Sequence, residues 1–541
     1  MKKLLCLLLA LVMVLGMCAC GDNGSAQSEK TDGTAEQPAE QQTADTEPET
    51  DDASSGPKEL TVGYVGNYNT FCPSTGLSDV SDVLIYRLVY DQLFEVNDKT
   101  METESRVLAE PMEWVDDNTV KLTIKSGITY ADGTEMTAED ILCDLQMYVT
   151  NGFTEIGYYS IIDYEASHVE DTYTLYLVYT EANASAITRL AIPIVSKAFY
   201  EEHPDGDDAW WSGDVNGSGP YEVTDYSLDE YIVLEKRADY WDKDVSYDAD
   251  KITIKFYADG TAMLADLNNG VINVAFGLDT NMIDSLRSTA ADNIAIETMS
   301  GNDVYRLVFS GTSEKVADIN VRQAIVHAVD WKTLAVAAFG NCGEEAKSHY
   351  PSTFDCYAEH EGYAYDPELA KQYLADAGYA EGELTLKYLA NDTSGTAVGE
   401  LLQGYLAEIG INLEVDTMEL ASAFGYFMDP NSPYDLMTKS QPGGNPARDP
   451  YDDFFLPQSP MAMAHINDEK YIEMATKANT IMDDDERNEQ YKAIDDYLYE
   501  TVQIVPCAEL LTGYAYNTDV VSSVQLCSVG KGCLADIELT A

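Results

Sequence analysis

Acidic side chains are the most frequent candidates for chemistry in this chain of 541 residues. Neighbouring carboxylates occur at Asp452-Asp453 and in the run that starts at Asp483, and two carboxylates can supply the acid and the base of a hydrolase. Such pairs are expected by chance among 95 acidic residues, and Asp483 stands where it would cap a helix around 487–499. The sequence contains no GxSxG elbow, no HExxH motif and no recognisable Cys–His pair. We therefore expect that the chain is not an enzyme, with hydrolysis by two carboxylates as the alternative.

Cysteines and histidines, the usual metal ligands, lack the spacing of a metal site. The cysteine pairs 342/356 and 527/533 are not CxxC motifs. The histidines are scattered, among them His168, His203, His327, His349 and His465. We expect no metal and no other cofactor, and we expect His327 to pack within a helix. One or two disulfides are compatible with an exported chain, but the sequence does not give their pairing.

The N-terminus carries an export signal. A short basic start, Met1–Lys3, precedes an almost unbroken apolar run, Leu4–Val14, and then small residues. Cys20 follows Ala19 and resembles the cysteine of a bacterial lipobox, whose thiol is acylated and becomes the new N-terminus. Cys18 fits less well, because the residue before it is a methionine. We expect a signal peptide over 1–20, a lipid on Cys20 and a position on the extracytoplasmic face of the cell membrane, with a plain secretory signal as the alternative.

Composition separates a spacer from a folded region. Residues 21–57 contain no aromatic side chain and no aliphatic one larger than alanine, so they cannot bury enough apolar surface to order. We expect a disordered acidic linker there. The chain as a whole carries a formal net charge of −64, which repels phosphate backbones and anionic headgroups. Nucleic acid is therefore not expected as a partner, and membrane contact is expected only through the lipid.

The folded region shows a mixed α/β pattern. The apolar spacing predicts a strand at 60–65, a helix over 83–94 and a strand at 119–124. An Asp-Gly turn at 132–133 then leads to a helix that opens with a capping box, in which Thr137 and Asp140 bond reciprocally.

Several blocks of this region resemble the family 5 solute-binding proteins, the extracytoplasmic oligopeptide- and dipeptide-type receptors of ABC importers. They follow the family's order and cover most of residues 58–510. The blocks are the stretch Val120–Leu142 with its Asp-Gly-Thr turn, Gly217-Ser218-Gly219-Pro220-Tyr221, Arg237-Ala238-Asp239-Tyr240-Trp241, the helix Asn320–Asp330 with Val-Arg-Gln-Ala-Ile, and the helix Tyr365–Tyr379. Locally these residues make turns, caps and core, so we expect them to be scaffold rather than binding residues.

The resemblance implies an α/β fold, a two-lobed clamp of the periplasmic-binding-protein type (type II, cluster C type) with an extra domain inserted in lobe one. It implies lobe one over 58–100, 215–310 and 505–541, the inserted domain over 101–214, and lobe two over 311–504.

By resemblance, the implied function is to capture oligopeptides between the lobes and deliver them to the permease and ATPase subunits of an ABC importer, as a monomer. An oligosaccharide or another small organic solute is the alternative ligand. A sensor or adhesin outside transport is the alternative role.

The resemblance also indicates solute contacts. Peptide receptors of this family carry an ammonium-binding aspartate in a Trp-x-x-Asp-Tyr-x-Asp-Pro segment, but residues 440–450 here lack the tryptophan and have no clear equivalent of that aspartate. A buried ammonium needs a counter-charge, which Asp435 or Asp449 would supply unless the solute has no free amino terminus. The expected solute contacts are Asn69, Phe71, Tyr305, Asp435, Asn445, Arg448 and Asp449.

Overall fold

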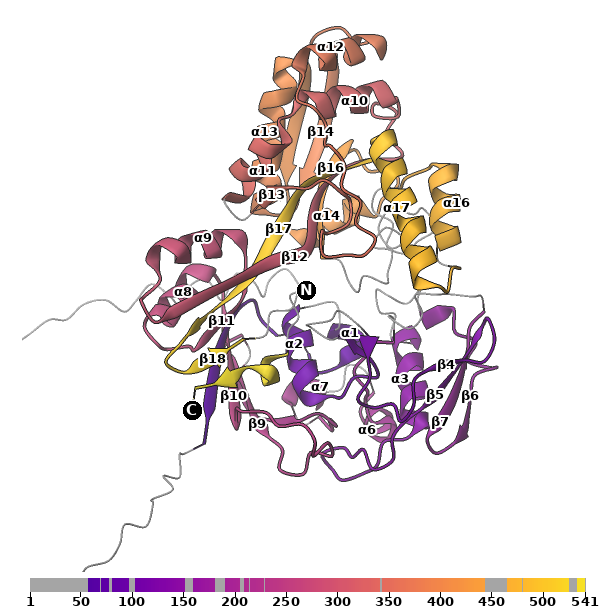
Figure 1. Cartoon of the computed structure of the whole chain (residues 1–541), viewed down its shortest axis with the longest axis vertical. Helices are drawn as coiled ribbons and strands as arrows, with labels where there is room; N and C mark the ends of the chain where they lie inside the picture. The colour runs from indigo at the N-terminus through magenta and orange to yellow at the C-terminus, as the bar shows by residue number, and fades with distance from the viewer. Residues whose placement is uncertain are drawn as a thin grey trace, which may run out of the picture. The chain divides into compact units, whose positions relative to one another are not determined.

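A mixed sheet of eleven strands forms the centre of the fold, with the order β15-β14-β16-β12-β17-β11-β1-β10-β9-β8 and β13 paired to β17 (Figure 1). The strands are β1 Glu59–Val65, β8 Tyr221–Ser227, β9 Tyr231–Lys236, β10 Lys251–Tyr257, β11 Val274–Leu278, β12 Ile294–Phe309, β13 Gly343–Glu345, β14 Leu384–Ala390, β15 Ile411–Thr417, β16 Leu436–Pro442 and β17 Ile504–Asn517.

This computed structural model describes residues 57–68, 70–76, 80–96, 103–150, 159–180, 190–204, 209–213, 215–227, 229–340, 343–442, 465–478, 480–524 and 533–540. All of them belong to one unit, Ser55–Ala541. The predicted signal peptide, Cys20 and nearly all of the predicted linker lie outside the described residues.

Two groups of parallel strands flank the two longest strands. β1 is parallel to β10 and β11, and β14 is parallel to β15 and β16. β12 and β17 lie antiparallel to each other between the groups, and each of them pairs with one group, β12 with β16 and β17 with β11. These pairings make the two groups run in opposite directions, so the carboxyl ends of one group point toward those of the other.

Helices follow the strands of both groups. In the first group, β10 leads to α8 (Gly260–Asn268) and β11 to α9 (Thr280–Thr289). In the second group, β14 leads to α13 (Thr393–Glu408) and β15 to α14 (Leu420–Phe427). Alternation of strand and helix produces parallel pairing, because a parallel strand needs a crossover connection. The remaining helices of the second group are α10 Ile319–Ala328, α11 Trp331–Phe339, α12 Pro367–Asp376, α16 Glu469–Ala478 and α17 Asp484–Thr501.

A separate sheet of four strands has the order β4-β5-β7-β6. Its strands are β4 Glu113–Trp114, β5 Thr119–Thr123, β6 His168–Asp171 and β7 Thr174–Val178, and α3 (Ala138–Thr150) packs on it. Alternate residues of β5 are buried, as a strand with one face on a core requires. This sheet and α3 have a hydrophobic core of their own.

The hydrophobic cores extend across the predicted lobe boundaries. Tyr305, Leu307 and Phe309 at the end of β12, and Val505 and Cys507 at the start of β17, pack in the core that holds α10, α11 and β14. The core of the second group therefore includes the adjoining ends of the two long strands.

Local sequence signals predicted several elements correctly. The strands expected at 60–65 and 119–124 are confirmed as β1 and β5. Half of the expected capping box forms, because Asp140 accepts the backbone N–H of Thr137 at 2.7 Å, whereas the Thr137 hydroxyl donates to Asp140 at 2.9 Å and the Asp140 N–H donates to the Thr137 carbonyl. Asp366 and Asp483 cap α12 and α17. The helix expected over 83–94 is α2, Val80–Val89, and it ends earlier because the following residues pair with another segment, with the Leu93 N–H donating to the Ile192 carbonyl.

The described cysteines Cys72, Cys143, Cys356, Cys507 and Cys533 are free thiols, and Cys342 and Cys527 lie outside the described residues. His327 has the packing role that was expected. Its ring stacks on Tyr373 with the centroids 5.7 Å apart, and its Nδ1 lies 2.8 Å from the carbonyl oxygen of Ala364. No helix within the described ranges is long and apolar enough to cross a membrane.

Candidate functional site

The carboxyl ends of the two groups of parallel strands face each other near the middle of β12. The end of β11, Leu278, lies opposite Gly513 of β17, which pairs with Thr298 of β12. The end of β16, Pro442, lies opposite Asp303 of β12. Three residue steps of β17, from Gly513 to Leu510, separate these two levels, about 10 Å at the usual rise. Ligands of open α/β sheets bind beyond the carboxyl ends of the strands, so this region of β12 is the candidate site.

A β-bulge interrupts β12 between the two levels. Ser300 pairs with Leu511 and Asp303 with Leu510, so two residues of β12 have no counterpart on β17. A bulge bends a strand and increases its local twist. The two carboxyl edges are thus joined through a strand that is already bent where they meet.

A hydrogen-bonded cluster supports the carboxyl edge of the second group. The Tyr305 hydroxyl lies 3.2 Å from Thr438 Oγ1 and donates to Asp392 Oδ1 at 3.3 Å. The Tyr388 hydroxyl lies 2.6 Å from Thr438 Oγ1 and donates to the Gly395 carbonyl at 2.7 Å. Burial raises the pKa of Tyr305 above its usual range, so this hydroxyl remains a neutral hydrogen-bond donor.

Asp392 connects the cluster to α13. It caps the helix by accepting the Gly395 N–H at 2.6 Å, and it is half-buried. A side chain on Gly395 would place its Cβ 2.7 Å from the Tyr305 hydroxyl oxygen and 3.0 Å from Thr438 Oγ1. Glycine is needed at 395 because the helix approaches these two side chains so closely.

The described carboxyl edges are acidic. The residues that precede helices α8, α9, α13 and α14 are Asp259, Asp279, Asp392 and Glu419. Each aspartate accepts backbone N–H groups of the helix it precedes. These charges therefore hold helix starts in place, and they also give the edges a negative potential.

Of the predicted contacts, Tyr305 is brought to this edge. Its side chain is buried, and its hydroxyl forms hydrogen bonds with the half-buried Asp392 and the buried Thr438. Phe71 follows β1 but is 0% exposed, and it packs on Tyr68 with the ring centroids 4.7 Å apart. The other predicted contacts Asn69, Asn445, Arg448 and Asp449 lie outside the described residues.

Asp435 lies away from the site. It immediately precedes β16, at the opposite end of that strand from Pro442. Its carboxylate is 3.0 Å from Lys315 Nζ and accepts hydrogen bonds from Ser313 Oγ at 2.6 Å and from the Lys387 N–H at 2.8 Å. The structure therefore does not bring Asp435 together with Tyr305, and its charge is already compensated.

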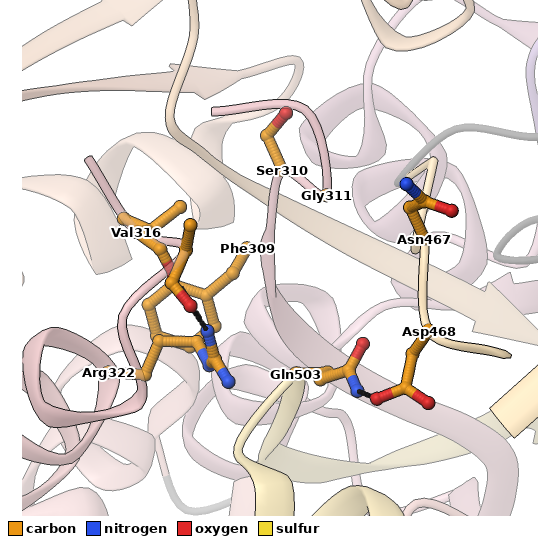
Figure 2. Close-up of a pocket in the computed structure, with 9 residues that line it drawn as sticks. Phe309, Ser310, Gly311, Val316, Arg322, Asn467, Asp468 and Gln503 are labelled. Atoms are coloured by element: carbon orange, nitrogen blue, oxygen red, sulfur yellow. Dashed lines mark hydrogen bonds between the residues drawn. The ribbon is translucent and has the colours of Figure 1, made fainter. Parts of the chain in front are cut away.

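A cavity of about 180 Å³ also lies at the far end of β12 (Figure 2). Its polar lining is engaged in internal bonds. Gln503 donates to Asp468 at 2.7 Å, and Arg322 donates to the carbonyl groups of Val316 and Thr501. These bonds join the residue before β17 to the start of α16, and they join α10 to the end of α17, which is a structural role.

Sequence reasoning missed Asp392, Thr438, Tyr388 and Gly395. A usable signal existed for Asp392, because an aspartate between an apolar strand and a run of Thr, Ser and Gly is a helix N-cap candidate. Nothing in the sequence indicates that this cap meets Tyr305, which is 87 positions away.

Known proteins share this architecture. Residues 105–460 match the family described as bacterial extracellular solute-binding proteins, family 5 middle. The glutathione-binding protein of Salmonella typhi is 25% identical over 370 residues, which is 67% of this chain and 70% of that protein.

Two crystal structures have the same fold. The ABC transporter substrate-binding protein CtaP of Listeria monocytogenes has a TM-score of 0.78 at 23% identity, and the oligopeptide-binding protein AppA of Bacillus subtilis, solved with a nonapeptide, has 0.75 at 18% identity. Each comparison covers 90% of this chain and 100% of the other.

These likenesses confirm the predicted α/β periplasmic-binding-protein fold with an extra domain. The family binds solutes outside the cytoplasm and is not a family of enzymes, in agreement with the expectation from the sequence. The chain belongs to family 5 of the bacterial extracellular solute-binding proteins.

Proposed function

We propose that this chain is a lipid-anchored receptor that captures oligopeptides between two lobes and delivers them to the permease and ATPase subunits of an ABC importer. The observation that carries the proposal is that two carboxyl edges face each other along β12, a strand whose pairing with β17 shifts register between them. Two surfaces joined by a shared strand can close on a solute by a hinge motion. A lipid on Cys20 and a linker over 21–57 would keep the receptor near its permease.

Support for peptides comes from the relatives. AppA of Bacillus subtilis was solved with a nonapeptide, and the Salmonella typhi relative binds glutathione, itself a tripeptide. The departure of residues 440–450 from the family's peptide motif favours the alternative, an oligosaccharide or another small organic solute. The acidic carboxyl edges favour solutes that carry positive groups.

The proposed solute contacts are Asn69, Asn445, Arg448 and Asp449, together with Asp392. Phe71 and Tyr305 would act from beneath the surface, because both are buried. The first proposed lobe comprises 58–100, 215–310 and 505–541, and 101–214 is the domain inserted in it. The second proposed lobe is 311–504. The continuous core around the ends of β12 and β17 supports a hinge that lies within these strands rather than at their ends.

Thermal unfolding with added solutes tests the proposal. A solute that binds only the folded chain stabilises it by about 2.7 kcal/mol at a hundredfold excess over its Kd. We expect this shift with oligopeptides and not with oligosaccharides. A shift with glycans alone would overturn the peptide proposal, and breakdown of a bound solute would overturn the receptor proposal.

A further inference from the structure

Asp144 occupies an unusual position on α3, a helix shared by two hydrophobic cores. Ile141 and Leu145 of this helix pack in the core of the four-stranded sheet, whereas Met147 packs in the core that contains α2 and β1. The helix therefore joins the two cores. Asp144 lies on it with 2% of its surface exposed.

The Asp144 carboxyl group has no hydrogen-bond partner within the described part of the chain. Neither carboxyl oxygen accepts a hydrogen bond from the described residues, and this side chain takes part in no ion pair among them. The Val195 N–H favours the ionised form but does not have the geometry of a hydrogen bond. An unpaired carboxylate in an apolar core is far less favourable than a neutral carboxylic acid, so the geometry alone indicates a protonated side chain.

Asp140, one turn earlier, is the opposite case. Its carboxylate accepts the Thr137 N–H at 2.7 Å, the Thr137 hydroxyl at 2.9 Å and the Lys197 N–H at 2.8 Å. Three donors satisfy an ionised group. Its negative charge then opposes a second charge at Asp144, four residues along the same helix.

Among the described residues, the titratable groups around Asp144 include no cation. They are Asp140, Cys143 and Tyr148 of α3, Tyr130 before α3, Tyr90 after α2, and Tyr164. Lys197 lies near Cys143, but its ammonium group pairs with Glu139 and Glu201 at the surface. Burial, followed by the charge of Asp140, raises the pKa of Asp144 well above its ordinary value.

We propose that Asp144 makes the packing of α3 between the two cores sensitive to pH, with the protonated acid holding the helix in place and ionisation releasing it. The proton is bound in the packed state and lost in the open state, so rising pH favours opening. Between the ordinary and the raised pKa of this carboxyl, each pH unit increases the opening equilibrium about tenfold.

Amide hydrogen exchange of the full chain between about pH 6 and about pH 8 tests the proposal. Asp91, whose pKa is raised to about 6, is half ionised at the lower end of this window, so the slopes are compared in the upper half of the window, where Asp91 contributes little. Base-catalysed exchange itself accelerates about tenfold per pH unit. As long as the pH stays below the raised pKa of Asp144, we expect the α3 amides to accelerate about a hundredfold per pH unit in the natural chain and about tenfold in Asp144→Asn.

Matched controls keep the result decisive. Glu139→Gln lies on the same helix but is exposed, and it should retain the hundredfold slope. Asp144→Leu replaces the acid by an apolar group and should show the tenfold slope even if the asparagine variant does not fold. Within the natural chain, the amides of α12 provide a reference, because their exchange rate should rise only about tenfold per pH unit. Equal slopes for α3 and α12 in the natural chain would overturn the proposal.

Discussion

His349 and Asp495 form a fully buried pair in which Nδ1 lies 2.5 Å from Oδ1 and both side chains are 0% exposed. The other ring nitrogen of His349 lies 2.9 Å from the Ile504 carbonyl oxygen, so both nitrogens face acceptors and are satisfied together only when both carry protons. Asp495 also accepts hydrogen bonds from Ser348 Oγ at 2.7 Å and from His360 Nε2 at 3.0 Å. One carboxylate thus ties a loop to α17.

Asp495→Asn should destabilise the chain by about 3–5 kcal/mol, because it removes one member of a buried charged network and leaves the other uncompensated. Urea unfolding measures the loss. Asp496→Asn is the matched control, since that neighbouring side chain is 64% exposed, and it should change the free energy of unfolding by less than about 0.5 kcal/mol. Similar losses in the two variants would contradict a special role for Asp495.

The same pair predicts an acid dependence. Burial opposes ionisation of Asp495, but hydrogen bonds from His349 and His360 outweigh it and hold its pKa below the usual range. A lowered pKa stabilises the folded state above the ordinary carboxyl pKa, and the contribution is lost as pH falls below that value. Asp495→Asn should therefore lose less stability than the natural chain between about pH 4 and about pH 2.

Asp91 should give the opposite pH dependence. Its buried carboxylate accepts hydrogen bonds from Tyr240 at 2.9 Å and from Trp241 at 2.7 Å, yet burial raises its pKa from 3.8 to about 6. A raised pKa stabilises the folded state at low pH, and about 3 kcal/mol should be lost as pH rises from about 4 to about 6. Asp91→Asn should flatten that part of the urea-unfolding profile. An unchanged slope would show that Asp91 has an ordinary pKa.

Two glycines of α13 should respond with opposite signs to alanine. Gly395→Ala pushes a methyl group against Tyr305 and Thr438 and should cost about 1–3 kcal/mol. Gly404→Ala meets no atom within 4 Å and should stabilise the helix by about 0.5–1 kcal/mol. Thermal unfolding compares the two, and a stabilised Gly395→Ala would mean that the cluster packs less tightly than described.

Asp392→Ser tests the proposed site. Serine still caps α13, so stability should change little, while removal of a charge from the carboxyl edge should weaken binding of a cationic peptide by about tenfold. Asp366→Ser is the matched control, because Asp366 caps α12 by accepting the N–H three residues on, as Asp392 does for α13. Titration calorimetry gives both affinities. Equal affinities in the two variants would remove Asp392 from the site.

Cys20→Ala should abolish labelling by a radioactive fatty acid and release the chain from the membrane fraction, because a single thiol carries the proposed anchor. Cys18→Ala should keep the label. If labelling depended on Cys18 instead, the proposed lipidation and cleavage site at Cys20 would be wrong.

Local chemistry is what the sequence determined. The strands at 60–65 and 119–124 and the caps at Asp366 and Asp483 depend on residues a few positions apart, where spacing alone decides the hydrogen bonds. The ordered blocks also identified the family, because their residues form turns and caps that the fold requires.

Tertiary structure decided which polar groups share a site. Asp435 and Asp392 are both acids beside strands of the second group, but they lie at opposite ends of these strands. Asp435 forms an ion pair with Lys315, whereas Asp392 accepts a hydrogen bond from Tyr305. Asp144 and Asp140 stand on one helix face, yet one is unpaired and the other fully satisfied. Whether each of these carboxyl groups is paired depends on contacts between segments distant in the chain. A carboxyl group becomes buried without a hydrogen-bond partner only when those segments pack together.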